Sequence, residues 1–147
     1  MADFEIVTKN SIQTVLQALG RQADAALEDI GLRAEGYAKM KTPVGTPEST
    51  GIVGYVSSGL RKSITHKVVR GDVFIGTNQK YAPYVELGTG IYATDGQGRK
   101  SPWVWRDKNG KYHRTRGMRP RHMMRDAIAD HKEEYKKTVL KYLKGNG

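Results

Sequence analysis

Among the residues that could do chemistry, Glu86 is the one set most closely among aromatic side chains. It lies in the segment Tyr81–Gly90, whose sequence is YAPYVELGTG, and it follows Tyr81 and Tyr84. A carboxyl group beside tyrosines acts as a general acid or base if it is buried. We favour the interpretation that Glu86 pairs with an arginine or caps backbone N–H groups, and we therefore expect no enzyme activity. A hydrolase or nuclease that combines Glu86 with a histidine is the alternative.

The histidines and the glycine-rich patterns do not predict a catalytic, metal or cofactor site. Gly88–Ala93 fits the G-x-G-x-x-G/A pattern of dinucleotide-binding loops, but the next residues, TDGQG, do not open the helix that such loops require. No G-x-S-x-G nucleophile elbow occurs. The histidines lie in separate predicted elements or nine residues apart on one helix, unlike metal ligands on adjacent turns: they are His66, His113, His122 and His131. We expect no metal and no cofactor.

Positive charge is concentrated in one part of the chain. The net charge is +10, and residues 99–125 carry +9, because they hold ten cations and the single acid Asp107. Such a segment favours a polyanion or acidic partner surfaces nearby, while the alternative is a charged loop that is simply solvated. The residues that we assign to DNA or partner contact are Arg99, Lys100, Arg106, Lys108, Lys111, Arg114 and Arg116.

Aromatic residues interleave with these cations. Trp103, Trp105 and Tyr112 offer faces on which bases of a single strand can stack. The interpretation that we favour is packing, because Trp103 and Trp105 point the same way from one predicted strand. The neighbouring arginines remain candidates for contact with duplex phosphate.

Length and composition limit the architecture. Chains of 147 residues commonly form one domain, so we expect a single domain over residues 1–147. Hydrophobic residues make up 37% of the sequence, which predicts a modest core. The absence of cysteine excludes disulfides and thiolate metal sites. No secretion signal and no long apolar run is visible, so we expect no membrane partner.

The N-terminal part of the chain has helical periodicity. From Ser11 to Met40 the apolar residues recur every three or four positions, which predicts a long amphipathic helix. Asn10 or Ser11 is expected to cap its first turn, and Pro43 lies past its end. Each glycine in such a helix costs roughly 1 kcal/mol relative to alanine, so a close contact or a bend is expected at one of them. These glycines are Gly20, Gly31 and Gly36.

Turn residues divide the middle of the chain. Residues 41–60 are rich in glycine and proline without a period, which predicts a flexible loop. A first hairpin is expected from Ser63–Val69 to Val73–Thr77, with its turn at Arg70–Asp72.

A second hairpin is expected within the basic stretch of about 99–116. Its strands are Pro102–Arg106 and Lys111–Thr115, and Asn109-Gly110 in the turn tolerates positive φ. A final helix is expected from Pro120 to about Lys144. This order of elements predicts an α+β fold, in which an antiparallel sheet of about four strands packs with a long N-terminal helix and a C-terminal helix.

Five segments follow one another along the chain: the N-terminal helix, the loop TPVGT at Thr42–Thr46, GLRKSI at Gly59–Ile64, YAPYVELGTG at Tyr81–Gly90, and Arg119-Pro120 before Ala127-Ile128. In this order they resemble the small tail-completion or head-tail joining proteins of long-tailed phages. The likeness covers about residues 8–130, and Tyr81–Gly90 is its most specific part.

The chain departs from the family pattern at two places. Residues 47–58 are inserted where members run directly from the proline loop into the leucine-arginine element. His122–Met124 occupies the place of a common aromatic residue after the second proline. The contact at the start of the last helix is therefore expected to differ.

The resemblance implies a structural virion protein at the neck of the phage, made in the cytoplasm of the bacterial host. It implies a ring subunit, hexameric to match the sixfold tail, that contacts neighbouring neck and tail-tube proteins and, non-specifically, double-stranded DNA in the lumen. The residues expected to organise the subunit or its interface are Tyr81, Pro83, Tyr84, Glu86, Gly88, Thr89 and Pro120. A tail terminator and a basic nucleic-acid-binding module are the alternative functions.

Overall fold

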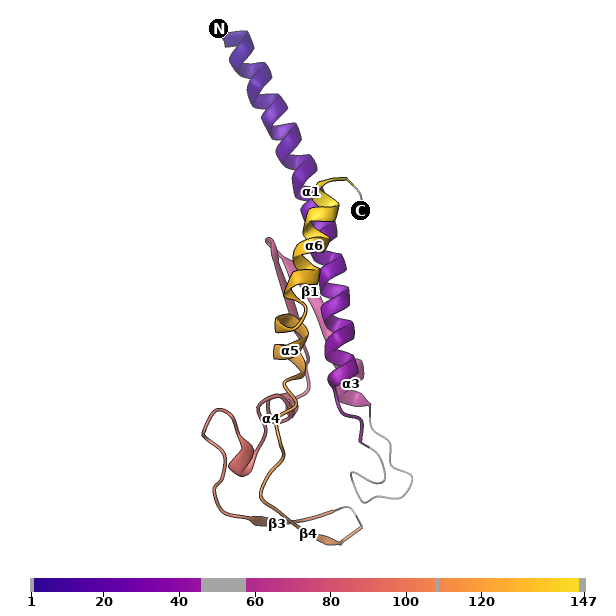
Figure 1. Cartoon of the computed structure of the whole chain (residues 1–147), viewed down its shortest axis with the longest axis vertical. Helices are drawn as coiled ribbons and strands as arrows, with labels where there is room; N and C mark the ends of the chain where they lie inside the picture. Colours follow the sequence, from indigo (N-terminus) through magenta and orange to yellow (C-terminus); the bar gives the residue numbers. More distant parts are fainter. Residues whose placement is uncertain (1, 46–57, 108, 146–147) are drawn as a thin grey trace.

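The chain is organised along one long helix, α1. The computed structural model describes residues 2–45, 58–107 and 109–145, and within α1 it describes side chains from residue 17 onward. Figure 1 shows α5, α6 and the β1–β2 hairpin lying alongside α1, with β3 and β4 at one end of the molecule. The elements in chain order are α1 (Ala2–Lys41), α3 (Gly59–Ser63), β1 (Thr65–Val69), β2 (Asp72–Gly76), α4 (Ala82–Leu87), the 3₁₀ turn η1 (Gly90–Tyr92), β3 (Trp103–Arg106), β4 (Tyr112–Thr115), α5 (Met123–Ala129) and α6 (Lys132–Leu143).

The structure confirms the long N-terminal helix that the periodicity predicts, but the helix begins earlier than expected. It runs through Asn10 and Ser11, so the predicted cap is wrong. Its end is close to the prediction: the hydroxyl of Thr42 donates a 2.6 Å hydrogen bond to the Ala38 carbonyl, and Pro43, which restricts the residue before it, follows. The buried stripe of α1 consists mainly of small residues at a spacing of four: Ala26, Ile30, Ala34 and Ala38.

The first hairpin forms where predicted, but with other bounds: β1 begins at Thr65 because Ser63 ends α3, and β2 begins at Asp72, which was expected in the turn. β1 and β2 pair antiparallel with Val69 opposite Asp72, and the two turn residues, Arg70 and Gly71, have φ of 50° and 84°. Positive φ at both central positions is the type I′ geometry that matches the twist of a hairpin. A Cβ on Gly31 would lie 2.4 Å from the ring of His66 on β1, so Gly31 is the close contact expected at one of the α1 glycines.

The prediction of one sheet of about four strands is wrong. The described residues form two separate two-stranded antiparallel sheets, β1–β2 and β3–β4. The strands of the second pair are connected to the body through residues 88–91 and 116–118, which hydrogen-bond to each other beside α4. This stem holds β3 and β4 away from β1 (Figure 1), so the hairpins cannot share an edge.

The predicted C-terminal helix is two helices. Pro120 is not in its first turn, because α5 begins at Met123, and the helical run breaks between Ala129 and Lys132. The Tyr135 hydroxyl donates a 2.5 Å hydrogen bond to the carbonyl of Ala127, the acceptor that His131 N–H would use in a continuous helix. This hydrogen bond joins α6 to the last turn of α5 across the break.

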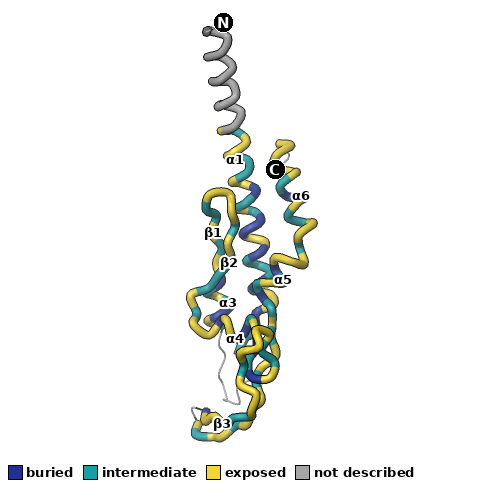
Figure 2. The backbone as a smooth tube through the Cα atoms, turned by 90° about the vertical axis from the view of Figure 1, so that its left-hand side faces the viewer, coloured by how far each residue is buried: buried dark blue, intermediate teal, exposed yellow. Residues whose placement is uncertain are grey.

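The core is small, as the composition predicts. It lies where the C-terminal end of α1 meets α3, α4 and α5 (Figure 2). Its members are Ala38, Leu60, Ile64, Ala82, Val85, Met123 and Ala127. Most of the predicted loop 41–60 lies outside the described residues. Its two ends are not loop-like: Thr42 is buried, and Gly59 begins α3. Across the described ranges, no helix is long and apolar enough to cross a membrane.

Candidate functional site

Two of the segments that carry the resemblance, Tyr81–Gly90 and the stretch from Arg119 to Ile128, contact each other directly. The carboxylate of Glu86 on α4 accepts hydrogen bonds of 2.9 Å from the backbone N–H groups of Met124 and Arg125, in the first turn of α5. The backbone N–H of Arg121 also donates to the carbonyl of Val85, at 2.9 Å. The first N–H groups of a helix have no partner within it, so Glu86 satisfies two of them. This contact is the capping alternative predicted for Glu86.

A second set of hydrogen bonds joins the residues after α4 to the 116–118 segment. The Thr89 N–H donates a 2.9 Å hydrogen bond to the carbonyl of Met118, and the Met118 N–H donates at 2.8 Å to the Thr89 hydroxyl. Gly90 has a φ of 61°, and a Cβ on it would lie 1.9 Å from the Arg116 carbonyl oxygen. Only glycine permits this approach of two backbones. Thr89 is therefore a structural partner of the 116–118 segment.

Gly88 and Pro120 belong to the same junction. A Cβ on Gly88, where φ is 79°, would lie 2.9 Å from Cδ of Pro120. Pro120 thus packs against the turn that ends α4. It has this role in place of the predicted position at a helix start.

The two tyrosines of this segment are largely exposed in the described structure. α4 buries Ala82 and Val85, whereas Tyr81, Pro83 and Tyr84 are exposed, and 61% of Tyr84 is accessible. Their large aromatic surfaces are free to contact another molecule.

Residues 99–116, here called the basic arm, extend beyond this junction (Figure 1). In the arm, the register places Trp105 opposite His113 and Arg106 opposite Tyr112. The rings of Trp105 and His113 stack with centroids 4.6 Å apart, and the guanidinium of Arg106 lies 5.6 Å from the Tyr112 ring centroid. Trp103 is partly buried and lines a pocket with Tyr84 and Gly88, whereas Trp105 is 43% exposed, so only one of the two tryptophans is covered within the described chain.

The only acid of the arm is used internally. Asp107 accepts 2.9 Å hydrogen bonds from the backbone N–H groups of Asn109 and Lys111, and its other oxygen lies 2.7 Å from Nε2 of His113. The hydrogen bond from His113 lowers the pKa of Asp107, so this carboxylate stays charged inside the turn. Lys108 lies outside the described residues.

The cations of the arm are exposed and have no acidic partner in the described chain. Apart from the pair of Asp107 with His113, the ion pairs among the described residues lie outside the arm, on α1, α5, α6 and β1. The described arm cations are Arg99, Lys100, Arg106, Lys111, Arg114 and Arg116. Their charge is therefore available to an external anion.

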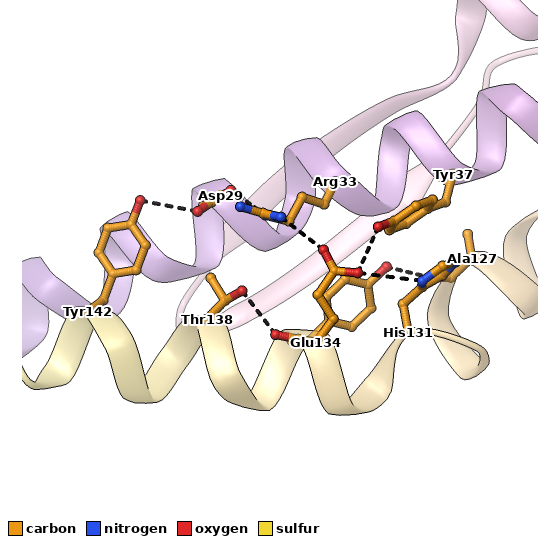
Figure 3. Close-up of polar contacts among 9 residues, drawn as sticks. Asp29, Arg33, Tyr37, Ala127, His131, Glu134, Thr138 and Tyr142 are labelled. Atoms are coloured by element: carbon orange, nitrogen blue, oxygen red, sulfur yellow. Dashed lines mark hydrogen bonds and ion pairs between the residues drawn. The ribbon is translucent and has the colours of Figure 1, made fainter. Parts of the chain in front are cut away.

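A polar cluster between α1 and α6 was not predicted (Figure 3). Arg33 bonds Asp29 at 2.8 Å and Glu134 at 2.9 Å, and Glu134 also accepts a 2.7 Å hydrogen bond from the Tyr37 hydroxyl. This bond lowers the pKa of Glu134 and raises that of Tyr37. The ring of His131 stacks on Tyr37 at 3.4 Å. Only the four-residue spacing of Asp29 and Arg33 was visible in the sequence.

A second unpredicted group joins β1 to α1. The ring of His66 lies between two carboxylates, with Nδ1 2.6 Å from Glu35 and Nε2 3.0 Å from Glu28. The carboxylate of Glu35 raises the pKa of His66, and Lys39 and His66 lower the pKa of Glu35. The seven-residue spacing of Glu28 and Glu35 puts them on one helix face, but their histidine partner could not be read from the sequence.

The remaining surface offers a groove. It has a volume of about 550 Å³ and lies between the end of β2 and α4, with Lys80, Pro83, Leu87 and Met124 among its lining residues. In the described ranges, no group of three or more acidic or histidine side chains is arranged to hold a metal ion. Three of the histidines, His66, His113 and His131, pair with carboxylates other than Glu86.

The comparisons with known proteins give no relative. The chain matches no protein-family model, and neither the curated proteins nor the solved structures contain a match. The site therefore has to be interpreted from its own geometry.

Proposed function

We propose that this chain is a structural virion protein of a long-tailed phage, a subunit of a ring at the neck that completes the tail and joins it to the DNA-filled head. The observation that carries the proposal is the arrangement of the Tyr81–Gly90 segment. Glu86 and Thr89 tie it to the start of α5 and to the 116–118 segment, while Tyr81 and Tyr84 face outward. Fixed backbone with exposed aromatic side chains suits a protein interface.

The distribution of apolar side chains supports an assembled state. Ten hydrophobic residues are buried among the described residues, and five of these are alanines, whereas fifteen large hydrophobic residues are exposed. Burying large side chains contributes about 1.5–3 kcal/mol each, so their exposure leaves much of the available stabilisation to neighbouring subunits. A ring subunit at the neck has such neighbours.

The sixfold ring and the neck and tail-tube partners come from the resemblance. Measuring the mass of the purified protein, alone and mixed with tail tubes, tests them. A ring that forms only in the mixture supports assembly on the tail. A chain that stays monomeric in both samples contradicts the proposal.

A nonsense mutation in the gene tests the role in the phage. We expect filled heads beside separate tails of normal length under the electron microscope. Overlong tail tubes would favour the alternative of a tail terminator, because a terminator stops tube growth. Normal virions from the mutant would contradict both neck roles.

A surface variant tests the interface. Tyr84→Ser should reduce assembly of the oligomeric ring, because it removes an exposed aromatic side chain from the Tyr81–Gly90 segment. Lys137→Ser on α6 is the control, since Lys137 is also exposed but is not one of the fifteen exposed hydrophobic residues. Equal yields of the oligomeric ring from both variants would show that the Tyr81–Gly90 segment is not the interface.

A further inference from the structure

We infer that the basic arm binds the phosphate backbone of double-stranded DNA through one face of the β3–β4 hairpin, without reading the base sequence. The resemblance implied a non-specific contact with DNA without saying where, and the inference assigns it to one face of one hairpin and to named arginines. It is carried by the charge and register of the arm and does not depend on the phage assignment.

The register separates the hairpin into two faces. Directly opposed residues of an antiparallel pair lie on the same face, and neighbours along a strand lie on opposite faces. One face therefore carries Trp103, Trp105, His113 and Thr115, and the other carries Val104, Arg106, Tyr112 and Arg114. All four residues of the second face are exposed, whereas three of the first are partly buried. We call the second one the cationic face.

The arginines of the cationic face form a pair. Arg106 and Arg114 are diagonal neighbours across the hairpin, with backbones about 7–8 Å apart. Arg106 donates a 3.1 Å hydrogen bond from Nε to the Gly110 carbonyl and lies over the Tyr112 ring, which restrains its orientation. A guanidinium restrained in this way loses less freedom when it binds a phosphate.

Within the described residues, no carboxylate pairs with the arginines or lysines of the arm. Asp107 is held by the turn and by His113 and does not contact Arg106 or Arg114 in the described structure. Lys111 and Arg116 add charge at either end of β4. A row of unpaired cations on an exposed hairpin complements the two phosphate strands of a duplex, whose density of negative charge is high.

The geometry favours duplex phosphate over stacking on single strands. A single-strand platform needs aromatic rings among its cations. The cationic face has one ring, that of Tyr112, and Arg106 lies over it. Trp103 and Trp105 are on the other face, where Trp105 stacks on His113.

An acidic protein is the competing partner, and the observations favour DNA over it. A protein interface would have to supply a carboxylate at the position of each buried cation, because unpaired buried charge is costly. A duplex presents phosphates continuously and accepts many registers, which fits a face whose cations are spread along a hairpin and its flanks.

Titrating a fluorescently labelled DNA duplex with the full-length protein at several salt concentrations tests the inference by anisotropy. Binding should weaken steeply as salt rises. Arg106→Glu combined with Arg114→Glu should weaken binding at low salt by roughly tenfold or more, and should make the log–log salt dependence shallower by about 2, since two phosphate contacts are lost.

The matched control is Lys132→Glu combined with Lys137→Glu. It changes the net charge equally, and both lysines are exposed on α6, which lies alongside α1 away from the β3–β4 hairpin (Figure 1). This control should bind DNA almost as the unchanged protein does. Circular dichroism of all three proteins establishes that the variants are folded.

Three outcomes would overturn the inference. One is that the protein does not bind the duplex at low salt. Another is that the arm and control variants lose the same affinity for the duplex. The third is displacement of the duplex by poly-glutamate as effective as by unlabelled duplex, which would assign the face to an acidic protein. None of these outcomes bears on ring formation or on the nonsense mutant, so failure here is distinguishable from failure of the neck proposal.

Discussion

A 2.9 Å hydrogen bond joins the backbone N–H of Met124 to the carboxylate of Glu86, thirty-eight residues earlier in the chain. It links the end of α4 to the positive end of α5, where a negative charge is favourable. The two segments that looked separate in the sequence are therefore one structural unit. The unit holds the Tyr81–Gly90 surface and the stem of the basic arm together.

Removing this carboxylate should destabilise the fold. Glu86→Ala leaves two N–H groups at the start of α5 without a protein partner and should lower the free energy of unfolding by about 1 kcal/mol, as the loss of a helix cap does. Glu86→Gln keeps one acceptor oxygen and should lose less. Urea denaturation of the unchanged protein and of both variants measures the order of their stabilities. Identical midpoints would show that the cap contributes nothing.

Gly90 should not tolerate a side chain. In Gly90→Ala the new Cβ would clash with the Arg116 carbonyl, and φ of 61° is unfavourable for alanine, so the variant should be destabilised and the stem of the arm displaced. Gly36→Ala is the control, because nothing lies within 4 Å of its Cβ position. It should gain up to about 1 kcal/mol from helix propensity. Thermal unfolding of both variants should move the midpoint in opposite directions.

The sequence predicted local features better than their assembly. Periodicity found α1, and turn residues found both hairpins, because these signals are local. The sequence did not predict the break between α5 and α6, and it failed where contacts between distant residues decide the arrangement: the stem formed by Thr89 and Met118 keeps the two hairpins apart. The capping role of Glu86 was among the alternatives, but its partners in α5 could not be identified before the fold was known.

The cluster between α1 and α6 should make α6 docking sensitive to salt. Glu134→Gln removes the charge that Arg33 and Tyr37 contact, and it should lower the thermal midpoint at low salt. The difference from the unchanged protein should shrink at high salt, because 45% of the Arg33 side chain is accessible and such pairs are screened. Glu133→Gln, whose carboxylate pairs with Lys136 on the outside of α6, is the control with the same charge change. A salt-independent difference would mean that shape, and not charge, holds α6.

The pair of His66 and Glu35 should give stability a maximum at mildly acidic pH. Folding raises the pKa of His66 above its ordinary 6.5, so this contribution is complete below 6.5 and is lost as pH rises through the folded value. Folding lowers the pKa of Glu35 below its ordinary 4.5, so that contribution is complete above 4.5 and is lost as pH falls. Both are complete between 4.5 and 6.5.

Unfolding midpoints measured across pH test this window with two variants. His66→Asn should flatten the fall in stability above pH 6.5, because no imidazolium remains between Glu28 and Glu35. His122→Asn is the matched control, since His122 makes no ion pair in the described structure and asparagine tolerates its φ of 48°. The control should retain the pH dependence of the unchanged chain. If both variants keep it, the hairpin is not held to α1 by the charge of His66.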